Sequence, residues 1–255
     1  MPEERFAQSA VLAPISFNAV SSDAQSYSFA MVGDTHIAAA DTRRLRQILQ
    51  IAESEGDAFL IVLGDIVDEG RREDFLAYTK AIKDAGWEGK VISVIGNHDI
   101  KYDGWKNYSE LIGPTHYSVD FGNARFMIID TADGSVGAQQ MGWLKERLSE
   151  ARPRHTFVLT HYMPVVPDER THLKLASISE AMSLMRLLST SHVRGCFGGH
   201  YHSYIVAQTE GVDYVVAGGA AGRRLPPVMT NFFVQVTVIG DSVSYLRQDL
   251  GVPSL

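Results

Sequence analysis

The sequence predicts a mixed α/β fold with two sheets, and three observations lead to this prediction. Three units of apolar strand, polar loop and amphipathic helix follow one another after residue 27. The C-terminal part instead carries short segments in which apolar and polar residues alternate. The 255 residues, 45% of them hydrophobic and 21% charged, suffice for one large domain with a substantial core.

The strand–loop–helix units predict a parallel sheet that is covered by helices. The second of the three strands, residues 58–63, is a continuous apolar run, as expected of a buried parallel strand. The first helix carries Leu45, Ile48 and Leu49 at amphipathic spacing. We expect the strands at residues 27–32, 58–63 and 91–95, and the helices at residues 41–54 and 72–85.

The later elements predict a second sheet. A hairpin is expected around Gly122-Asn123, because a short polar turn separates two strand-like runs. We expect its strands at residues 117–121 and 125–130, a helix at 139–148, and strands at 155–160 and 193–198. The alternating segments suit a mostly antiparallel second sheet, and they lie at residues 205–208, 214–216, 232–238 and 242–247.

The ends of the chain bear on domain organisation and location. Residues 1–27 show little periodicity and predict an N-terminal arm or short added strand, with a single domain at 28–255. No run reaches the roughly 18 apolar residues of a membrane-spanning helix. The acidic start does not resemble a signal peptide. These features predict a cytoplasmic protein, although a chain trimmed of an export signal would look the same.

Charge and cysteine usage exclude several classes of function. Lys and Arg number 23 and Asp and Glu number 30, so the formal net charge is −7. This balance argues against a broad nucleic-acid surface and against a polybasic membrane anchor. The single cysteine, Cys196, excludes an intramolecular disulfide and a cysteine-based zinc site. It lies within an apolar strand, and we expect it to be inert.

Metal-capable residues are concentrated where predicted strands end. In open α/β sheets, ligands bind beyond the carboxyl ends of the strands. Five successive strands end in such residues: Asp34 and His36, Asp65, Asn97 and His98, His161, and His200 and His202. Imidazoles and carboxylates without thiols suit Zn, Mn or Fe, and the set suits two adjacent divalent ions. If the segments are extended, each pair spaced i and i+2 can address one centre.

The ordered motifs resemble the calcineurin-like metallophosphoesterase superfamily, in particular its small bacterial phosphodiesterases and phosphatases. The motifs are Asp34-x-His36, Gly64-Asp65-x-x-Asp68, Gly96-Asn97-His98-Asp99, His161 and Gly199-His200-x-His202. The resemblance implies a four-layer α/β/β/α sandwich of two mixed sheets flanked by helices. It places a metal site at the carboxyl ends of the strands.

The resemblance also implies a role for each motif residue. One metal would be held by Asp34, His36, Asp65 and His202, and the other by Asp65 as a bridge, Asn97, His161 and His200. His98 would act on the substrate and not on the metal, and Asp68 would orient it. The two ions would be Mn, Fe, Zn or Ni.

Two departures narrow the resemblance. Protein Ser/Thr phosphatases of the superfamily carry Arg-Gly after Gly-Asp-x-x-Asp, whereas this chain has Glu69-Gly70. Purple acid phosphatases carry an iron-binding tyrosine where this chain has Asp68. Both subgroups are therefore disfavoured.

Each residue also has a structural interpretation. Taken alone, Asp34 and Asp65 suit helix N-caps or turns, His161 a hydrogen-bonded core histidine, and His200 with His202 an exposed strand pair. The ordered set of motifs favours the metal site over these structural roles.

Several residues near the motifs have two possible roles. His172 lies in the loop 163–178, which either covers the site or is a solvated charged loop. Arg223 and Arg224 meet substrate phosphate or form a surface pair. His116, His155 and Tyr117 are interpreted as structural, and Asn107 and Tyr108 as loop residues.

We therefore expect a dinuclear metal-dependent phosphoesterase acting on a small-molecule phosphoester. A metal-bridging hydroxide would attack phosphorus in line, and His98 would donate a proton to the leaving oxygen. A diester, including a cyclic nucleotide, is favoured because the chain lacks a clamping arginine and a dense cationic pocket. Three rival functions are a broad-specificity phosphomonoesterase, a non-catalytic scaffold on the same fold, and a single-metal amidohydrolase-type site. The oligomeric state stays open.

Overall fold

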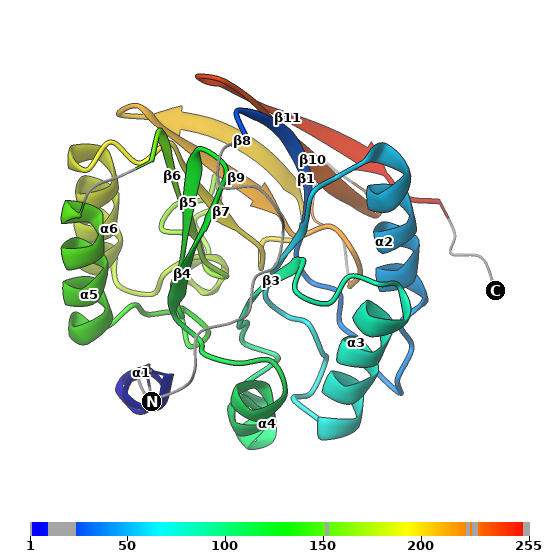
Figure 1. The fold of residues 1–255 in the computed structure, drawn as a ribbon. Helices are drawn as coiled ribbons and strands as arrows, with labels where there is room; N and C mark the ends of the chain where they lie inside the picture. The colour runs from blue at the N-terminus through cyan, green and yellow to red at the C-terminus, as the bar shows by residue number, and fades with distance from the viewer. Residues whose placement is uncertain (1, 10–23, 151–152, 223–224, 226–228, 252–255) are drawn as a thin grey trace.

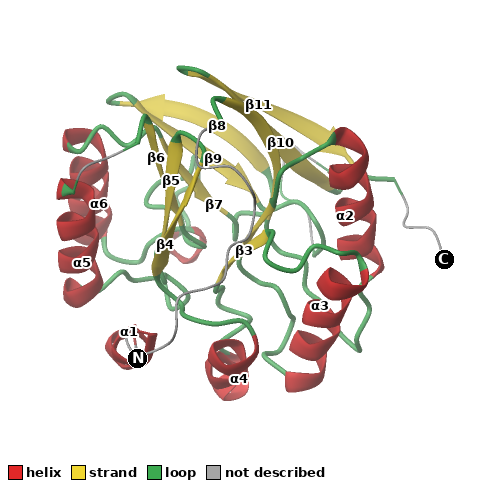
Figure 2. Cartoon of the chain, viewed as in Figure 1, coloured by secondary structure: helices red, strands yellow, loops and turns green. Residues whose placement is uncertain are grey.

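The computed structural model describes residues 2–9, 24–150, 153–222, 225 and 229–251. Two mixed β-sheets pack face to face, and helices cover both outer faces (Figure 1). Figure 2 shows the two groups of helices on opposite sides of the strands. This is the four-layer α/β/β/α arrangement that the motifs imply, and the predicted fold class is confirmed.

The first sheet has the strand order β11-β10-β1-β2-β3. Its strands are β1 (Ser26–Val32), β2 (Leu60–Leu63), β3 (Val91–Val94), β10 (Phe232–Ile239) and β11 (Ser242–Asp249). The first three run parallel, and β10 pairs antiparallel with β1 and β11. Its outer face is covered by α2 (Arg43–Glu55), α3 (Arg72–Asp84) and α4 (Gly104–Leu111). Helix α2 ends at Gly56, whose φ of 74° gives a left-handed cap.

The second sheet has the order β4-β5-β6-β7-β9-β8. Its strands are β4 (Tyr117–Phe121), β5 (Ala124–Ile128), β6 (His155–Leu159), β7 (Gly195–Gly198), β8 (Tyr204–Thr209) and β9 (Val212–Ala217). Helices α5 (Ala138–Ser149) and α6 (Ile178–Thr190) cover its outer face. At the start of α6, the Ser177 hydroxyl accepts a hydrogen bond from the Glu180 amide and caps the helix.

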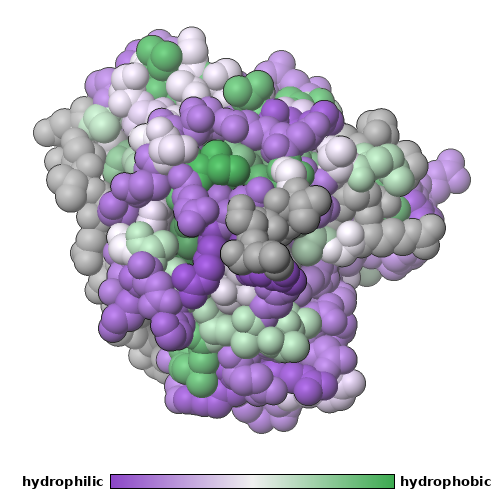
Figure 3. Space-filling view, turned by 90° about the vertical axis from the view of Figure 1, so that its right-hand side faces the viewer, coloured by the Kyte–Doolittle hydropathy of each residue, from purple (hydrophilic) through white to green (hydrophobic). Residues whose placement is uncertain are grey.

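The core between the sheets is rich in phenylalanine. Phe29 and Phe59 of the first sheet stack at 4.7 Å between ring centroids, and Phe126 of the second sheet meets both rings edge-on. These rings are fully buried, so the two sheets are held together by aromatic packing. The face over α2 and α3 is mainly hydrophilic with small hydrophobic patches, as expected of amphipathic helices (Figure 3).

Several elements differ from the expectation. Strands β10 and β11 join the first sheet, and β6 and β7 lie in the second, so the second sheet is mixed and not mostly antiparallel. Helices α4 and α6 were not expected, and Tyr108 is buried in α4 and is not a loop residue. The first residues form helix α1 (Pro2–Ser9), whereas residues 10–23 lie outside the described part. An alternating pattern indicates a half-buried strand, but it does not indicate which strands pair with it.

Parallel pairing brings the loops that carry the motifs to one edge. In the first sheet β1, β2 and β3 run parallel, and in the second sheet β5, β6, β7 and β9 do so. The carboxyl ends of parallel strands share one edge, so the loops after β1, β2, β3, β6 and β7 meet there. Within the described residues, we find no helix with the length and apolar content needed to cross a membrane.

Candidate active site

Unusual backbone conformations mark the strand ends where the motifs lie. Asp34, His36, Asp65 and His200 have positive φ values of 62°, 44°, 49° and 61°. A left-handed conformation costs a residue with a side chain about 1–3 kcal/mol and persists only where the surroundings impose it. The expectation that both i, i+2 pairs lie in extended segments is therefore wrong. Their side chains converge because the chain turns sharply after each strand.

Three of the expected ligands form a first group beyond β1 and β7. Asp34 Oδ1 lies 3.1 Å from His202 Nε2, and the Nε2 atoms of His202 and His36 are 3.5 Å apart. Each offers a ligand atom, and these atoms lie within 4.8 Å of one another. The two histidines of the Gly-His-x-His motif lie in different groups. His202 belongs to this group, whereas His200 belongs to a second group with Asp65 and His161.

The second group lies beyond β2, β6 and β7. Asp65, His161 and His200 form it, again with ligand atoms within 4.8 Å. His161 Nε2 lies 3.0 Å from Asn97 Oδ1 and 3.3 Å from Asp65 Oδ1. The other carboxylate oxygen of Asp65, Oδ2, lies 3.8 Å from His36 Nε2 in the first group. One carboxylate thus faces both groups.

Close backbone packing holds Asp65 in this position. A Cβ atom on Gly96 would collide with the backbone of Asp65, so only glycine fits there. The His98 amide donates to Asp65 Oδ1 over 2.8 Å. The Gly-Asn-His segment after β3 is therefore pressed against the Asp65 turn after β2.

Charges within the groups shift one another's titration. Burial alone would raise the pKa of the Asp34 carboxyl, but His202 and His161 outweigh it and hold that pKa below its ordinary value. Burial opposes protonation of His161, yet the charge of Asp65 raises its pKa to about 9. Burial and the neighbouring His161 lower the pKa of His200 to about 4. Two buried carboxylates thus draw positive charge into the site.

Asp68 contacts two histidines at once. Its Oδ1 atom lies 3.2 Å from His36 Nδ1 and 3.1 Å from His98 Nδ1, and its carbonyl oxygen lies 2.8 Å from His98 Nδ1. These contacts lie on the Nδ1 side of both rings, while His36 Nε2 faces His202 and His98 Nε2 lies 3.3 Å from Lys101 Nζ. Asp68 therefore contacts the Nδ1 atoms of both rings, and its contact with His36 was not expected.

Lys101 is a site residue that the sequence reasoning missed. It begins the short 3-10 helix η1 (Lys101–Asp103), directly after the Asn97 motif. Its Nζ atom lies 2.7 Å from His98 Nδ1 and 3.2 Å from the carbonyl oxygen of Asp68. The only available signal was a lysine three residues after His98, which does not distinguish a site cation from a surface one.

A family model for calcineurin-like phosphoesterases matches residues 27–204. That span contains all nine expected site residues and most of both sheets. The chain belongs to the calcineurin-like phosphoesterases. It is a phosphoric ester hydrolase of a family that uses divalent metals.

Several known proteins are similar to this chain in sequence or in fold. A cAMP/cGMP dual specificity phosphodiesterase from Mycobacterium tuberculosis is 24% identical over 227 residues, covering 75% of this chain and 71% of that protein. A protein from Fibrobacter succinogenes described as a probable cyclic nucleotide phosphodiesterase is 25% identical over 198 residues, covering 70% and 74%. Among solved structures, the yellow lupin purple acid phosphatase PPD1 superposes with a TM-score of 0.73 at 15% identity. It covers 89% of this chain and 52% of that one, and it supports the fold alone.

The loop after β6 reaches the centre of this phosphoesterase through its backbone. It contains the 3-10 helix η2 (Thr171–Leu173), and the carbonyl oxygen of His172 lies 2.8 Å from His200 Nε2. Tyr162, which the sequence reasoning also missed, lies 3.8 Å from the His200 ring between centroids. Asp168 and Arg170 of this loop pair with each other, and Lys174 donates to the carbonyl oxygen of Asp168. The loop therefore contacts the site through its backbone and Tyr162.

Other residues lie apart from this phosphoesterase's two groups. Asp99, the last residue of the Gly-Asn-His-Asp motif, accepts hydrogen bonds from the amides of Val67 and Gly96. Burial and the charge of Asp65 raise its pKa to about 7. His155 Nε2 lies 2.8 Å from the carbonyl oxygen of Gly240 and is structural, as expected.

His116 and Cys196 also lie apart from the two groups. His116 stacks on Phe6 and is structural. Burial raises the pKa of the Cys196 thiol to about 12, which suits an inert residue. Arg223 and Arg224 lie outside the described residues.

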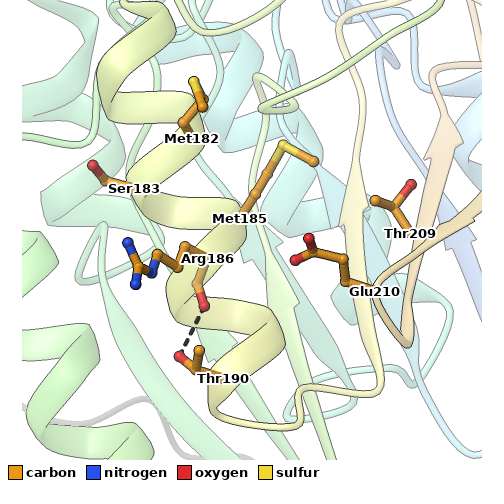
Figure 4. A pocket seen from close by; sticks show the side chains of 7 residues that line it. All are labelled: Met182, Ser183, Met185, Arg186, Thr190, Thr209 and Glu210. Atoms are coloured by element: carbon orange, nitrogen blue, oxygen red, sulfur yellow. Dashed lines mark hydrogen bonds between the residues drawn. The ribbon is translucent and has the colours of Figure 1, made fainter.

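A separate hollow lies between α6 and the β8–β9 hairpin. Its volume is about 550 Å³. Figure 4 shows Met182 and Met185 on α6 and Glu210 at the turn of the hairpin, with Arg186 directed away from it. Its described lining contains no histidine, so this hollow does not carry the chemistry of the two groups.

Proposed function

We propose that this chain hydrolyses small phosphodiesters, cyclic nucleotides among them, at a centre of two divalent metal ions. The observation that carries the proposal is the position of Asp65, whose two carboxylate oxygens face the two separate histidine groups. A carboxylate shared in this way is what two ions about 3.5–4 Å apart require.

The donor set fits two such ions. Asp34, His36 and His202 would hold one ion, and Asn97, His161 and His200 the other, with Asp65 bridging. Imidazole, carboxylate and amide donors without a thiol suit Mn, Fe, Zn or Ni. When bound, the ions supply an activated water and positive charge for the phosphoryl oxygens.

The chain's own residues supply the proton and the orientation of the substrate. His98 Nε2 is directed away from Asp68 and is placed to donate a proton to the leaving oxygen. Asp68 holds the His98 ring by two oxygens and fixes which nitrogen is presented. Lys101 adds one positive charge beside the His98 ring, 2.7 Å from Nδ1 and 3.3 Å from Nε2, and this charge would favour an anionic group near His98.

The charge beside His98 favours a diester over a monoester. One described lysine, Lys101, contacts His98, and a single cation suits the single charge of a diester better than the double charge of a monoester. Hollows of about 340 Å³ beside Asp68, lined mainly by carboxylates, and of about 470 Å³ beside His36, with Arg43 and Arg44 in its lining, flank the site. The two relatives that act on cyclic nucleotides or are described so agree with this preference.

The test compares hydrolysis of bis(p-nitrophenyl) phosphate, p-nitrophenyl phosphate and cAMP by the purified chain with Mn²⁺. We expect both diesters to be cleaved with higher kcat/KM than the monoester. Asp65→Asn should abolish activity, while Asp120→Asn, an exposed partner of Arg125, is the matched control and should not. A monoester that is far the best substrate would make the chain a phosphomonoesterase.

Metal analysis separates the dinuclear enzyme from a single-metal site and from a scaffold. Two equivalents of bound metal support the proposal. One equivalent, together with Asn97→Ala that loses neither metal nor activity, would point to a single-metal site. No bound metal and no activity with Mn²⁺, Fe²⁺, Zn²⁺ or Ni²⁺ would point to a non-catalytic scaffold.

A further inference from the structure

Helix α1 docks onto the domain through a buried charge, and it lies outside the residues that the family model matches. Arg5 on this helix is only 2% exposed. Its Nε and one terminal nitrogen lie 2.7 and 3.1 Å from the two carboxylate oxygens of Asp130. Asp133 adds a further contact at 3.4 Å. A buried guanidinium that contacts both oxygens of one carboxylate holds the helix in a specific position on the domain.

Two further contacts fix the helix on the same side. The Thr115 amide donates to the Ser9 hydroxyl over 2.6 Å. Phe6 stacks on the His116 ring with centroids 4.1 Å apart, and His116 meets Trp143 of α5 edge-on. Figure 1 shows α1 below α5 and beside α4. Its partner Asp130 follows the carboxyl end of β5.

Asp130 organises the turn that follows β5. Besides Arg5, its Oδ1 atom accepts from the Ala132 amide over 3.0 Å. Its backbone is held from α5, because Asp130 N donates to Gln140 Oε1 and Asp130 O accepts from Gln140 Nε2, both over 2.7 Å. The carboxylate is buried, so without Arg5 it would keep a negative charge away from water and the turn would have to move.

The next residue in this turn connects it to the candidate metal site. The Thr131 hydroxyl accepts from the amides of His161 and Tyr162 over 3.2 and 2.8 Å. It lies 2.8 Å from the Thr160 hydroxyl, which in turn donates to the carbonyl oxygen of Tyr162. A hydroxyl has one proton and two lone pairs, so Thr131 has all of these satisfied in one arrangement. A small displacement of Thr131 would therefore release the backbone on which His161 is carried.

We propose that α1 is a positioning element of the metal centre, and that Arg5 is a positioning residue for His161. Arg5 fixes the carboxylate of Asp130, Asp130 fixes the turn, and Thr131 in that turn holds the His161 amide. The inference rests on the proposed function in so far as His161 is a metal ligand. It assigns a role to a segment that lies before the family domain.

The test compares Arg5→Ala and Arg5→Lys with Arg154→Ala in the full chain. Arg154 pairs with Asp241 on the exposed surface, which makes it a matched arginine control. Two quantities are measured: amide hydrogen exchange of residues 160–163 without added metal, and Mn²⁺ binding by calorimetry. Loss of a residue that supports a metal ligand typically weakens metal binding by about 10–100-fold. We expect a loss in that range for the ion held by His161, and less for the other.

The outcomes separate this inference from the proposed function. Faster exchange at residues 160–163 in Arg5→Ala, with Arg154→Ala like the wild type, supports the positioning role even if no metal binds. Absence of metal binding in the wild type would overturn the proposed function alone. Wild-type exchange and metal affinity in Arg5→Ala, or a loss of protection spread evenly over the chain, would overturn the inference. If Arg5→Ala does not fold, Arg5→Lys keeps the charge without the fork and decides by the same two measurements.

Discussion

The Nδ1 atom of His161 lies 2.8 Å from the carbonyl oxygen of Leu63, so a histidine after β6 is bonded to the end of β2 in the other sheet. The carbonyl is an acceptor, so Nδ1 carries a proton toward it, and Nε2 is the ring nitrogen that faces Asn97 and Asp65. The contact sets the direction of the ring. It also places the candidate metal centre across the junction of the two sheets.

Metal binding is expected to stabilise the folded chain. Asp34 and Asp65 are almost completely buried, and a cation between them relieves their repulsion. At 100 times the dissociation constant, a ligand adds about 2.7 kcal/mol, which for a domain of this size raises Tm by about 5–10 °C. Differential scanning calorimetry with and without Mn²⁺ measures the shift, and a chelator should reverse it. An equal shift in Asp65→Asn would show that the metal binds elsewhere.

His98→Ala should lower kcat only for substrates with a poor leaving group. A general acid contributes about 10²–10⁴-fold when the leaving oxygen needs a proton. The ribose oxygen of cAMP needs one, whereas p-nitrophenolate leaves without it. We therefore expect a large fall with cAMP, a small one with bis(p-nitrophenyl) phosphate, and unchanged metal content. An equal fall for both substrates would exclude proton donation as the role of His98.

Lys101→Gln should raise KM for diesters more than it lowers kcat. A hydrogen bond to a charged group contributes about 1.5–3 kcal/mol, so a rise of about tenfold or more is expected. Inorganic phosphate as a competitive inhibitor provides a second readout, since its inhibition constant should rise in parallel. Lys106→Gln is the control, because Lys106 is exposed and pairs with Asp103. A KM equal to that of the wild type would remove Lys101 from the substrate site.

The stability of the chain should depend on pH through His116. Burial lowers the pKa of His116 to about 4, although the charge of Asp130 opposes the shift. In the unfolded chain the value is about 6.5. Between pH 4 and pH 6.5 the unfolded chain binds more protons than the folded chain, so the free energy of unfolding increases as pH rises through this range. The contribution of His116 to stability is therefore present at neutral pH and is lost as pH falls toward 4. The shift corresponds to about 3 kcal/mol.

Urea unfolding at pH 4 and pH 7 measures this difference. His116→Phe preserves an aromatic ring between Phe6 and Trp143 but cannot be protonated. We expect the substitution to reduce the difference between the two pH values. An unchanged difference would assign the pH dependence to other groups.

Much of the fold was predictable from local patterns, and the exceptions share a cause. The strands and helices between residues 26 and 95 lie close to their expected positions, because apolar runs and helical spacing report burial directly. Helix α6 was missed although Ala181, Leu184 and Leu188 form its buried face. The charged loop after His161 runs directly into this helix and obscures its spacing. The pairing of β10 with β1 joins residues about 200 positions apart, and no local pattern specifies such a partner.

The sequence by itself determined which residue types stand at the strand ends. Their order and their histidine, aspartate and asparagine content identified the family and the candidate ligands, because metal binding depends on the type of side chain and on its position in the chain. Only the tertiary structure decided which further groups contact these ligands. Asp68 contacts His36, Lys101 stands beside His98, and the backbone carbonyl of His172 reaches His200. It also decided that Arg5 is buried against Asp130. These relationships join segments that only folding brings together, since they depend on sharp left-handed turns and on packing across two sheets.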